Sequence, residues 1–338
     1  MPQTSGYNLK IKSVIRSVHP FPARMAPEVV WHELRQDGPG LTVLDPMAGS
    51  GTTLVAARLR GYRAVGYDLD PLAVLIAQSW VTNTRPVKTR KIALRVLAKA
   101  RDHARRIRVS EAYPRAADDE TKTFVRYWFD RRNRIQLAAL SRSISRVRDK
   151  SVRTVLWCAL SRTIITKQAG VSLAIDVSHS RPHRAYDKAP ILVFDAFERA
   201  VEHVLRVAPF RGTSRKAPSV VVRLADARKL PVPSSSVDIV ITSPPYLNAI
   251  DYMRAHKFSL IWMGHSVKDL RNIRAANLGA ERAQGAGLSP HAERVMKTIC
   301  DFGKLSGRQA GMLHRFVLDK RHQAQARNVR RERVRRNA

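Results

Sequence analysis

Two short segments combine side chains that could do chemistry with a backbone that could hold them in place. Residues 45–53, DPMAGSGTT, place an acid before two glycines and two threonines, directly after the apolar residues 41–44. Residues 242–246, TSPPY, place a hydroxyl, two prolines and an aromatic ring after the mostly apolar run 237–241. Consecutive prolines fix two φ angles and remove two backbone donors, so this second segment predicts a rigid corner.

The glycine-containing segment does not match the common phosphate-binding patterns. A P-loop needs a lysine after its last glycine, and none is present; a dinucleotide fingerprint needs a third glycine where Leu54 stands. What remains is an acid at a strand end, a glycine loop and the start of a helix. The acid suits a cationic or hydroxyl-bearing group, whereas the helix N–H groups suit a carboxylate. A ligand that carries both an ammonium and a carboxylate is an amino acid.

The surrounding pattern predicts an α/β fold. Strands are expected at 41–46, 63–67, 219–224 and 237–242, and helices at 25–36, after the glycine loop, and at 72–80. Strand and helix alternating at this spacing favour a parallel sheet with right-handed crossovers. Both chemical segments then lie at the carboxyl ends of strands, where open parallel sheets place their sites.

A long insertion separates the second strand from the third. Residues 86–215 read as basic helices with a polar loop at 176–190, which is far longer than an ordinary connection and indicates a separate functional module. The helices include the aromatic stretch 124–129, FVRYWF, and the loop carries Arg181 and Arg184. The aromatic stretch suits helix packing as well as nucleic-acid contact, and the two arginines suit either a nucleic-acid contact or an ordinary surface.

The composition favours a polyanionic partner. The 338 residues contain 61 Lys and Arg against 27 Asp and Glu, a formal net charge of +34, with a sequence pI near 11.3. Such an excess is typical of nucleic-acid binding, although a solvated Arg-rich surface would have the same composition. The N-terminus lacks the apolar core of a signal peptide and no segment is long and apolar enough to span a membrane, so we expect a soluble, cytoplasmic protein.

The cysteines and histidines favour neither thiol nor metal chemistry. Cys158 and Cys300 are the only cysteines, and neither follows a proline as a nucleophile for carbon methylation would. Both are expected to be structural, in a reducing compartment. His179 and His183 are four residues apart, but they lie in a proline-containing loop without acids of known placement. No metal site is predicted.

The motifs together resemble those of the S-adenosylmethionine-dependent DNA amino-methyltransferases, which act on cytosine N4 or adenine N6. DPMAGSGTT is similar to their cofactor motif, TSPPY to their catalytic motif, and residues 19–27, HPFPARMAP, to the segment that covers the methionine part of the cofactor. The resemblance implies a Rossmann-like methyltransferase fold with S-adenosyl-L-methionine as cofactor and double-stranded DNA as partner. A cognate restriction endonuclease is a further implied partner, as in restriction-modification systems.

The resemblance also assigns expected roles to individual residues. The ribose hydroxyls would bind Asp68, whereas Asp70 is expected to be a solvated acid at a helix start. Asp226 would lie near the adenine amine or be an ordinary turn residue, and Phe21 would pack on the cofactor or in the core. The methionine side of the cofactor would be lined by Asp45, Ala48, Gly49, Gly51 and Thr52.

For catalysis, the resemblance implies direct methylation of an amine without a covalent intermediate. The Ser243 hydroxyl and the Pro244 carbonyl would accept hydrogen bonds from the amine, with Pro245 fixing the corner and Tyr246 stacking on the flipped base. Serine at the first position of this motif favours cytosine N4 over adenine N6. An RNA amino-methyltransferase and an inactive nucleic-acid-binding remnant stay open as alternatives.

The resemblance covers the chain unevenly. It covers well the cover and cofactor half at 1–85 and the catalytic half at 216–265. It covers the helical insertion at 86–215, the candidate for DNA recognition, only weakly, and the basic helical or disordered tail at 266–338 not at all. Members of the family place further strands after the catalytic motif, and no strand pattern is found there. We therefore expect the C-terminal strands to be missing, as in a truncated gene product, with activity in doubt for that reason.

Overall fold

A parallel sheet forms the base of the molecule in the computed structural model, which describes residues 15–34, 40–210, 217–244 and 251–277. Its strand order is β5-β2-β1-β6, and every neighbouring pair is parallel. The four predicted strands are confirmed as β1 (Thr42–Asp45), β2 (Arg63–Asp68), β5 (Val220–Leu224) and β6 (Ile239–Val240). The chain is therefore an α/β protein, as its sequence pattern predicts.

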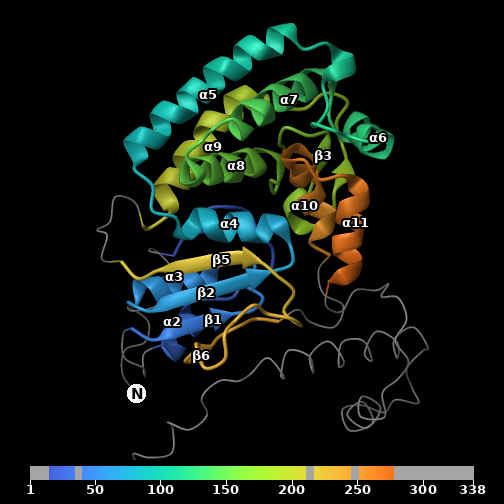
Figure 1. Cartoon of the computed structure of the whole chain (residues 1–338). Helices are drawn as coiled ribbons and strands as arrows, with labels where there is room; N and C mark the ends of the chain where they lie inside the picture. The colour runs from blue at the N-terminus through green and yellow to red at the C-terminus, as the bar shows by residue number, and fades with distance from the viewer. Residues whose placement is uncertain (1–14, 35–39, 211–216, 245–250, 278–338) are drawn as a thin grey trace, which may run out of the picture.

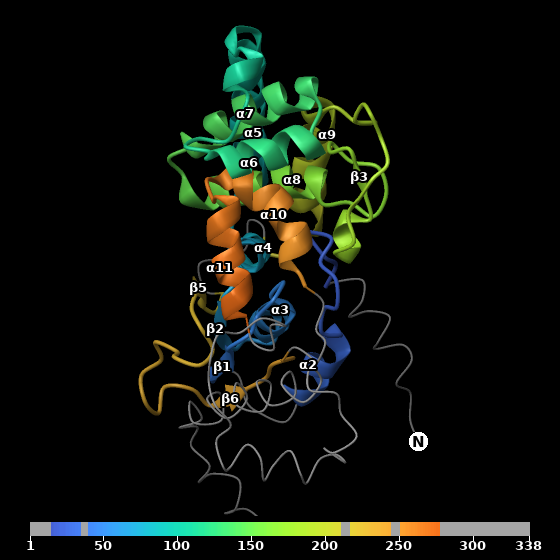
Figure 2. The ribbon, with the colours of Figure 1, turned by 90° about the vertical axis from the view of Figure 1, so that its right-hand side faces the viewer.

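The two faces of the sheet are covered differently. Helices α2 (Pro27–Glu33) and α3 (Thr52–Leu59) lie on one side, and α4 (Pro71–Val81) runs above β5 (Figures 1 and 2). On the other side, the segment between β5 and β6 packs against a small cluster made by Leu44, Tyr67 and Val237. The glycine loop after β1 thus leads directly into helix α3, which is held against the sheet.

The insertion forms a layer of helices beyond α4 (Figure 1). Residues 174–184 add a two-stranded antiparallel hairpin, β3 (Ala174–Ile175) and β4 (His183–Arg184), where the sequence predicts a loop. Strand β4 consists of polar residues, so it lacks the apolar run that marks the equally short β6. The helices are α5 (Pro86–Arg106), α6 (Asp119–Trp128), α7 (Arg131–Ser145), α8 (Lys150–Ile164) and α9 (Val193–Val207).

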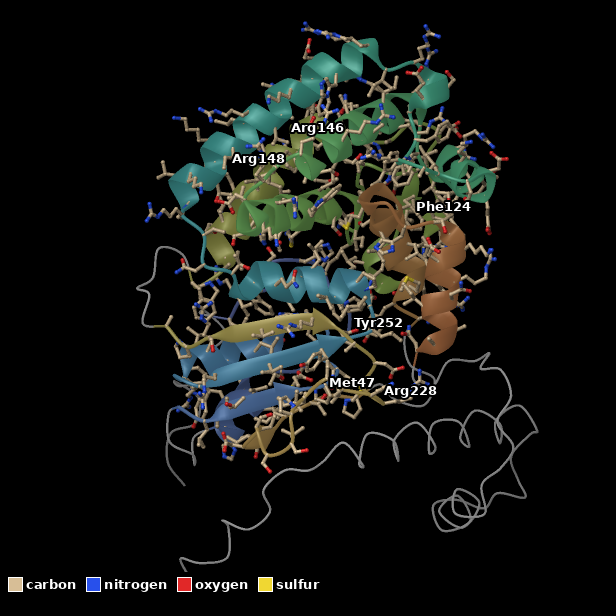
Figure 3. All side chains as sticks on the ribbon, in the orientation of Figure 1. Met47, Phe124, Arg146, Arg148, Arg228 and Tyr252 are labelled. Atoms are coloured by element: carbon tan, nitrogen blue, oxygen red, sulfur yellow. The ribbon has the colours of Figure 1, made fainter. Side chains whose placement is uncertain are left out.

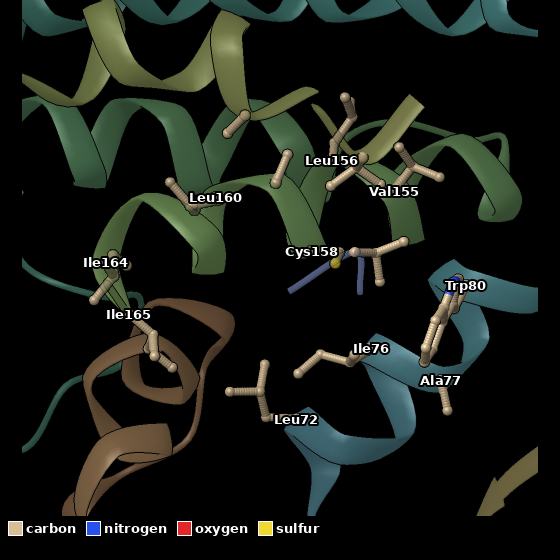
Figure 4. Packing of buried hydrophobic residues seen from close by; sticks show 14 of the residues in the cluster. Leu72, Ile76, Ala77, Trp80, Val155, Leu156, Cys158, Leu160, Ile164 and Ile165 are labelled. Atoms are coloured by element: carbon tan, nitrogen blue, oxygen red, sulfur yellow. The ribbon is translucent and has the colours of Figure 1, made fainter. Parts of the chain in front are cut away.

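Helix α8 joins the insertion to the rest of the fold through α4. Leu72, Ile76 and Trp80 of α4 are fully buried and face the apolar side of α8, which includes Leu156 and Cys158 (Figure 4). Both helices belong to one continuous hydrophobic core. Cys158 is a buried, unoxidised core residue, as expected, and Cys300 lies outside the described residues.

The chain returns to the helical layer after β6. Helices α10 (Met253–Leu260) and α11 (Val267–Ala276) run between this layer and the end of the sheet (Figure 2). A buried chain of polar groups fixes α10 in place, because His19 Nε2 lies 2.8 Å from Ser161 Oγ, which donates to Ser259 Oγ at 2.9 Å. No helix among the described residues is long and apolar enough to cross a membrane.

Candidate active site

A pocket opens where the carboxyl ends of the four strands meet the start of α10. It brings together all three segments that the sequence analysis singled out, although they are up to 222 residues apart in the chain, from Phe21 to Ser243. The predicted site residues that line it are Phe21, Asp45, Ala48, Gly49, Thr52, Asp68, Asp226, Ser243 and Pro244. Pro245 and Tyr246 lie outside the described residues.

The loop between β1 and α3 needs both of its glycines. Gly49 and Gly51 have φ angles of +49° and +91°, in the left-handed region that glycine tolerates best. Gly51 does not line the pocket. A Cβ at this position would lie 2.8 Å from the Cβ of Ala77, so Gly51 instead allows the start of α3 to approach α4. Its neighbour Thr52 faces the pocket, and the buried Thr52 Oγ1 has no hydrogen-bond partner among the described residues.

Two carboxyl groups of the pocket are held where ionisation is unfavourable. Burial raises the pKa of Asp45, the last residue of β1, to about 6. Burial and the neighbouring charge of Asp70 raise the pKa of Asp68 to about 7, against hydrogen bonds that favour its charged form. Two backbone N–H groups donate to the Asp68 carboxylate, from Gly49 at 2.8 Å and from Asp70 at 2.9 Å. Both acids would gain from a ligand that brings positive charge or hydroxyl donors.

Asp70 is not the solvated acid that the sequence suggested. It is 7% exposed, accepts from Leu72 N at 2.8 Å as the N-cap of α4, and pairs with the fully buried His256 of α10. Burial acts to raise the pKa of Asp70, but the charge and hydrogen bond of His256 lower it overall. The prediction was wrong because the partner lies 186 residues away, where no local pattern reveals it.

Asp226 is a turn residue that also lines the pocket. It follows β5 and accepts a hydrogen bond from Arg228 N at 2.9 Å. Its carboxylate forms an ion pair with the Arg228 guanidinium, 2.6 Å from Oδ2 to Nη2, and the same nitrogen donates to Ala276 O at 3.0 Å. The pair connects the β5 end to α11.

An aromatic wall faces the glycine loop. The rings of Phe21 and Tyr252 are stacked with centroids 5.2 Å apart, and the Phe21 ring lies 3.6 Å from where a Cβ of Gly49 would be. The wall also meets His256, 5.4 Å from Phe21. In Figure 3, Tyr252 and Met47 lie on the same side of the molecule at the end of the sheet. Phe21 is thus partly buried: it lines the pocket and also packs against the hydrophobic core.

Sequence reasoning missed several residues that line the pocket. Arg24 brings a guanidinium whose pKa is lowered by burial, and it lies 5.8 Å from the Trp80 ring centroid. Tyr252 and Asn277 come from segments whose sequence has no recognisable motif. Arg24 lies within HPFPARMAP, so the motif located it without showing that its charge reaches the site. The described residues contain no group of three or more His, Cys, Asp or Glu that could hold a metal ion.

Comparison with known proteins agrees with the motifs. Type II methyltransferase M.MjaII of Methanocaldococcus jannaschii is 20% identical over 72% of this chain and 61% of its own length. M.MvaI of Kocuria varians is 22% identical over 79% of this chain and 61% of its own length. M.BsoBI of Geobacillus stearothermophilus is 21% identical over 71% of this chain and 50% of its own length.

The chain therefore spans between half and about three-fifths of the length of these curated relatives. No family model matches the sequence, and no solved structure matches it. The relatives support the DNA methyltransferase family that the motifs indicated.

Proposed function

We propose that this protein is an S-adenosylmethionine-dependent DNA amino-methyltransferase with a Rossmann-like fold. The observation that carries the proposal is the single pocket shared by the Phe21 segment, the glycine loop, Asp68 and the Ser243-Pro244 corner. The strand order β5-β2-β1-β6 supports the Rossmann-like topology. From β1 the chain adds β2 and then β5 on one side, and later adds β6 on the other side, so β1 marks the switch point at which such sheets bind their ligands. The missing C-terminal strands remain a prediction, since residues 278–338 lie outside the described residues.

The pocket has the groups that the proposed cofactor needs. When bound, S-adenosylmethionine supplies an electrophilic methyl group on a sulfonium centre. Asp68 would accept hydrogen bonds from the ribose hydroxyls, and Asp45 would face the amino-acid end of the cofactor. Thr52 offers a hydroxyl without a hydrogen-bond partner among the described residues, and Arg24 a cation that suits a carboxylate.

The Phe21 and Tyr252 rings would shield the apolar part of the cofactor. Asp226 would accept a hydrogen bond from the adenine amine, and the Arg228 guanidinium, which forms an ion pair with Asp226, would hold the carboxylate in position. Gly51 would act through the backbone, by setting the position of the α3 N-terminus.

The corner after β6 would activate the target amine. An exocyclic amine shares its lone pair with the base ring, so its nitrogen becomes nucleophilic only when acceptors draw on the N–H groups. The Ser243 hydroxyl and the Pro244 carbonyl would supply these acceptors, and the prolines would keep them fixed without reorganisation. Pro245 completes the rigid corner and Tyr246 would stack on the flipped base.

Duplex DNA is the proposed substrate, with cytosine N4 preferred over adenine N6. The preference rests on Ser243 at the first position of the motif. The helices of residues 86–215 would contribute to DNA recognition, because methylation of one site requires contacts beyond the pocket. A restriction endonuclease partner and a cytoplasmic location also remain predictions.

The decisive experiment measures cofactor binding and the methylated base together. Wild-type protein should bind S-adenosylmethionine in calorimetry, and the Asp45→Ala variant should lose most of that affinity. Nucleoside mass spectrometry of DNA from an expressing host should then detect N4-methylcytosine, and Ser243→Ala should abolish it. N6-methyladenine would correct the base, a product in tRNA alone would favour an RNA enzyme, and cofactor binding without any methylated base would favour an inactive remnant.

A further inference from the structure

A second hollow lies beside the candidate active site and is lined almost entirely by basic side chains. Arg181 and His183 reach it from the segment that forms the β3–β4 hairpin, Arg254 and Lys257 from α10, and Arg274 from α11. Three segments that are distant in sequence therefore direct their cations into one place. Nothing in the proposed methyl transfer uses these residues.

The charges of the hollow are only partly compensated within the protein. Arg254 and Arg274 share one carboxylate oxygen of Asp251, at 3.0 and 2.7 Å. Arg181 and Lys257 form no ion pair within the described part of the chain. Asp251 and Glu120 are the acids whose charges act on Lys257, so the four cations outnumber these acids and repel one another until an anion enters.

Lys257 is held in this arrangement by packing rather than by an acid. Its ammonium lies 5.0 Å from the centroid of the Phe124 ring, a cation–π contact, and Phe124 comes from α6 of the insertion (Figure 3). Burial lowers the pKa of Lys257, which Asp251 partly offsets. Lys257 is thus a partly buried cation without an ion-pair partner among the described residues, and such a group gains from an anionic ligand.

The hollow and the candidate active site share the elements that line them. At the start of α10, Tyr252 lines the active-site pocket and Arg254 lines the basic hollow. At the end of α11, Asn277 lines the active-site pocket, and Arg274, about one turn earlier, lines the basic hollow. A ligand in the hollow is therefore positioned relative to the target base through the same two helices.

We propose that this basic hollow binds a backbone phosphate of the DNA strand next to the target nucleotide. The proposal rests on the proposed function. It extends the DNA-binding surface from residues 86–215 to residues of α10 and α11. A nucleotide that leaves the stack needs its flanking phosphates held, and a cluster of guanidinium and ammonium groups supplies the charge-assisted hydrogen bonds for this. Since α10 directly follows the catalytic corner, phosphate binding and base positioning would occur together.

The test compares the salt dependence of DNA binding among matched variants. Each phosphate contact on duplex DNA contributes about 0.9 to the slope of log Kobs against log salt concentration. Because the hollow is proposed to hold one phosphate, Arg181→Gln/Arg274→Gln should reduce the slope by about 0.9, and Arg181→Gln alone should reduce it by less. The control Arg63→Gln removes one charge from an exposed residue at the amino end of β2, outside residues 86–215 and opposite the strand ends that line the pocket, and its slope should equal that of the wild type.

The measurement uses fluorescence anisotropy of a labelled duplex with the full chain, and calorimetry with S-adenosylmethionine checks that each variant keeps its pocket. Arg181→Gln alone should not disturb folding, because Arg181 is exposed and lies outside the helices and strands. An unchanged slope in both hollow variants, with methylated DNA still formed, would overturn this proposal and leave the proposed function standing. Loss of affinity for tRNA but not for duplex would assign the hollow to RNA, and a wild type without salt-dependent DNA binding would overturn both proposals.

Discussion

The affinity for S-adenosylmethionine should fall steeply as the pH falls from about 8 to about 6. The cause lies in two acids of the free pocket, Asp45 with a pKa of about 6 and Asp68 with a pKa of about 7. Both values lie above the ordinary pKa of an aspartate, because burial disfavours the charged form. The proposed roles of both residues need the ionised form, so protons must leave when the cofactor binds.

The two pKa values determine the size of the effect. Between pH 8 and pH 6 the ionised fraction of Asp68 falls by about tenfold and that of Asp45 by about twofold, so the affinity should fall by about twentyfold. At pH 7, binding should release about 0.6 proton, because Asp68 is half protonated and Asp45 about one-tenth protonated. His19 does not contribute, since burial lowers its pKa to about 3 and keeps it neutral throughout this range.

Calorimetry at three pH values, each in two buffers of different ionisation enthalpy, gives both the affinity and the number of protons released. The variant Asp68→Asn should bind more weakly at pH 8 but retain only the twofold dependence that belongs to Asp45. A wild-type affinity that is flat across this range, or a net uptake of protons on binding, would refute the assignment of these two carboxylates to the cofactor.

Three further substitutions test the packing around the pocket. Gly51→Ala should lower the free energy of unfolding by at least about 2 kcal/mol, since it adds a steric clash with α4 to the cost of a left-handed backbone. Gly264→Ala is the control, because Gly264 has a φ of +104° and a Cβ added there would have no atom within 4 Å, so only the backbone cost should appear. Equal urea midpoints for Gly51→Ala and Gly264→Ala would contradict the clash predicted at Gly51. His256→Ala should cost about 3–5 kcal/mol in urea unfolding, because it leaves the Asp70 carboxylate buried without its side-chain partner; adding Asp70→Asn should restore part of that loss. Phe21→Leu should raise the Kd for S-adenosylmethionine about two- to tenfold by removing a stacked ring, and an unchanged Kd in calorimetry at pH 8 would place that ring outside the binding site.

The sequence predicted the parts of the site that depend on local pattern. The ends of β1 and β2, the loop that contains Gly49, and the corner at Ser243 all follow a short apolar run, and parallel strands bring such ends to one edge. For these residues the position along the chain is enough to fix the position in space.

The remaining parts of the site depend on packing between distant segments. His256 pairs with Asp70, Arg228 donates to the carbonyl of Ala276 in α11, and Tyr252 stacks on Phe21. Such contacts follow from how the segments of α10 and α11 pack against the rest of the site, which no periodicity encodes. The basic hollow has the same origin, because its arginines and lysine are unremarkable in a chain of net charge +34.

The contact between α4 and α8 has a consequence for engineering. Leu72, Ile76 and Trp80 are buried by the helical layer, and α4 also begins at Asp70 in the pocket. A chimera that exchanged residues 86–215 for the helices of a relative would have to match this apolar seam, or it would loosen the cofactor end of the same helix. New target specificity should therefore be easier to obtain by changing exposed side chains of this segment outside the basic hollow than by grafting the whole segment.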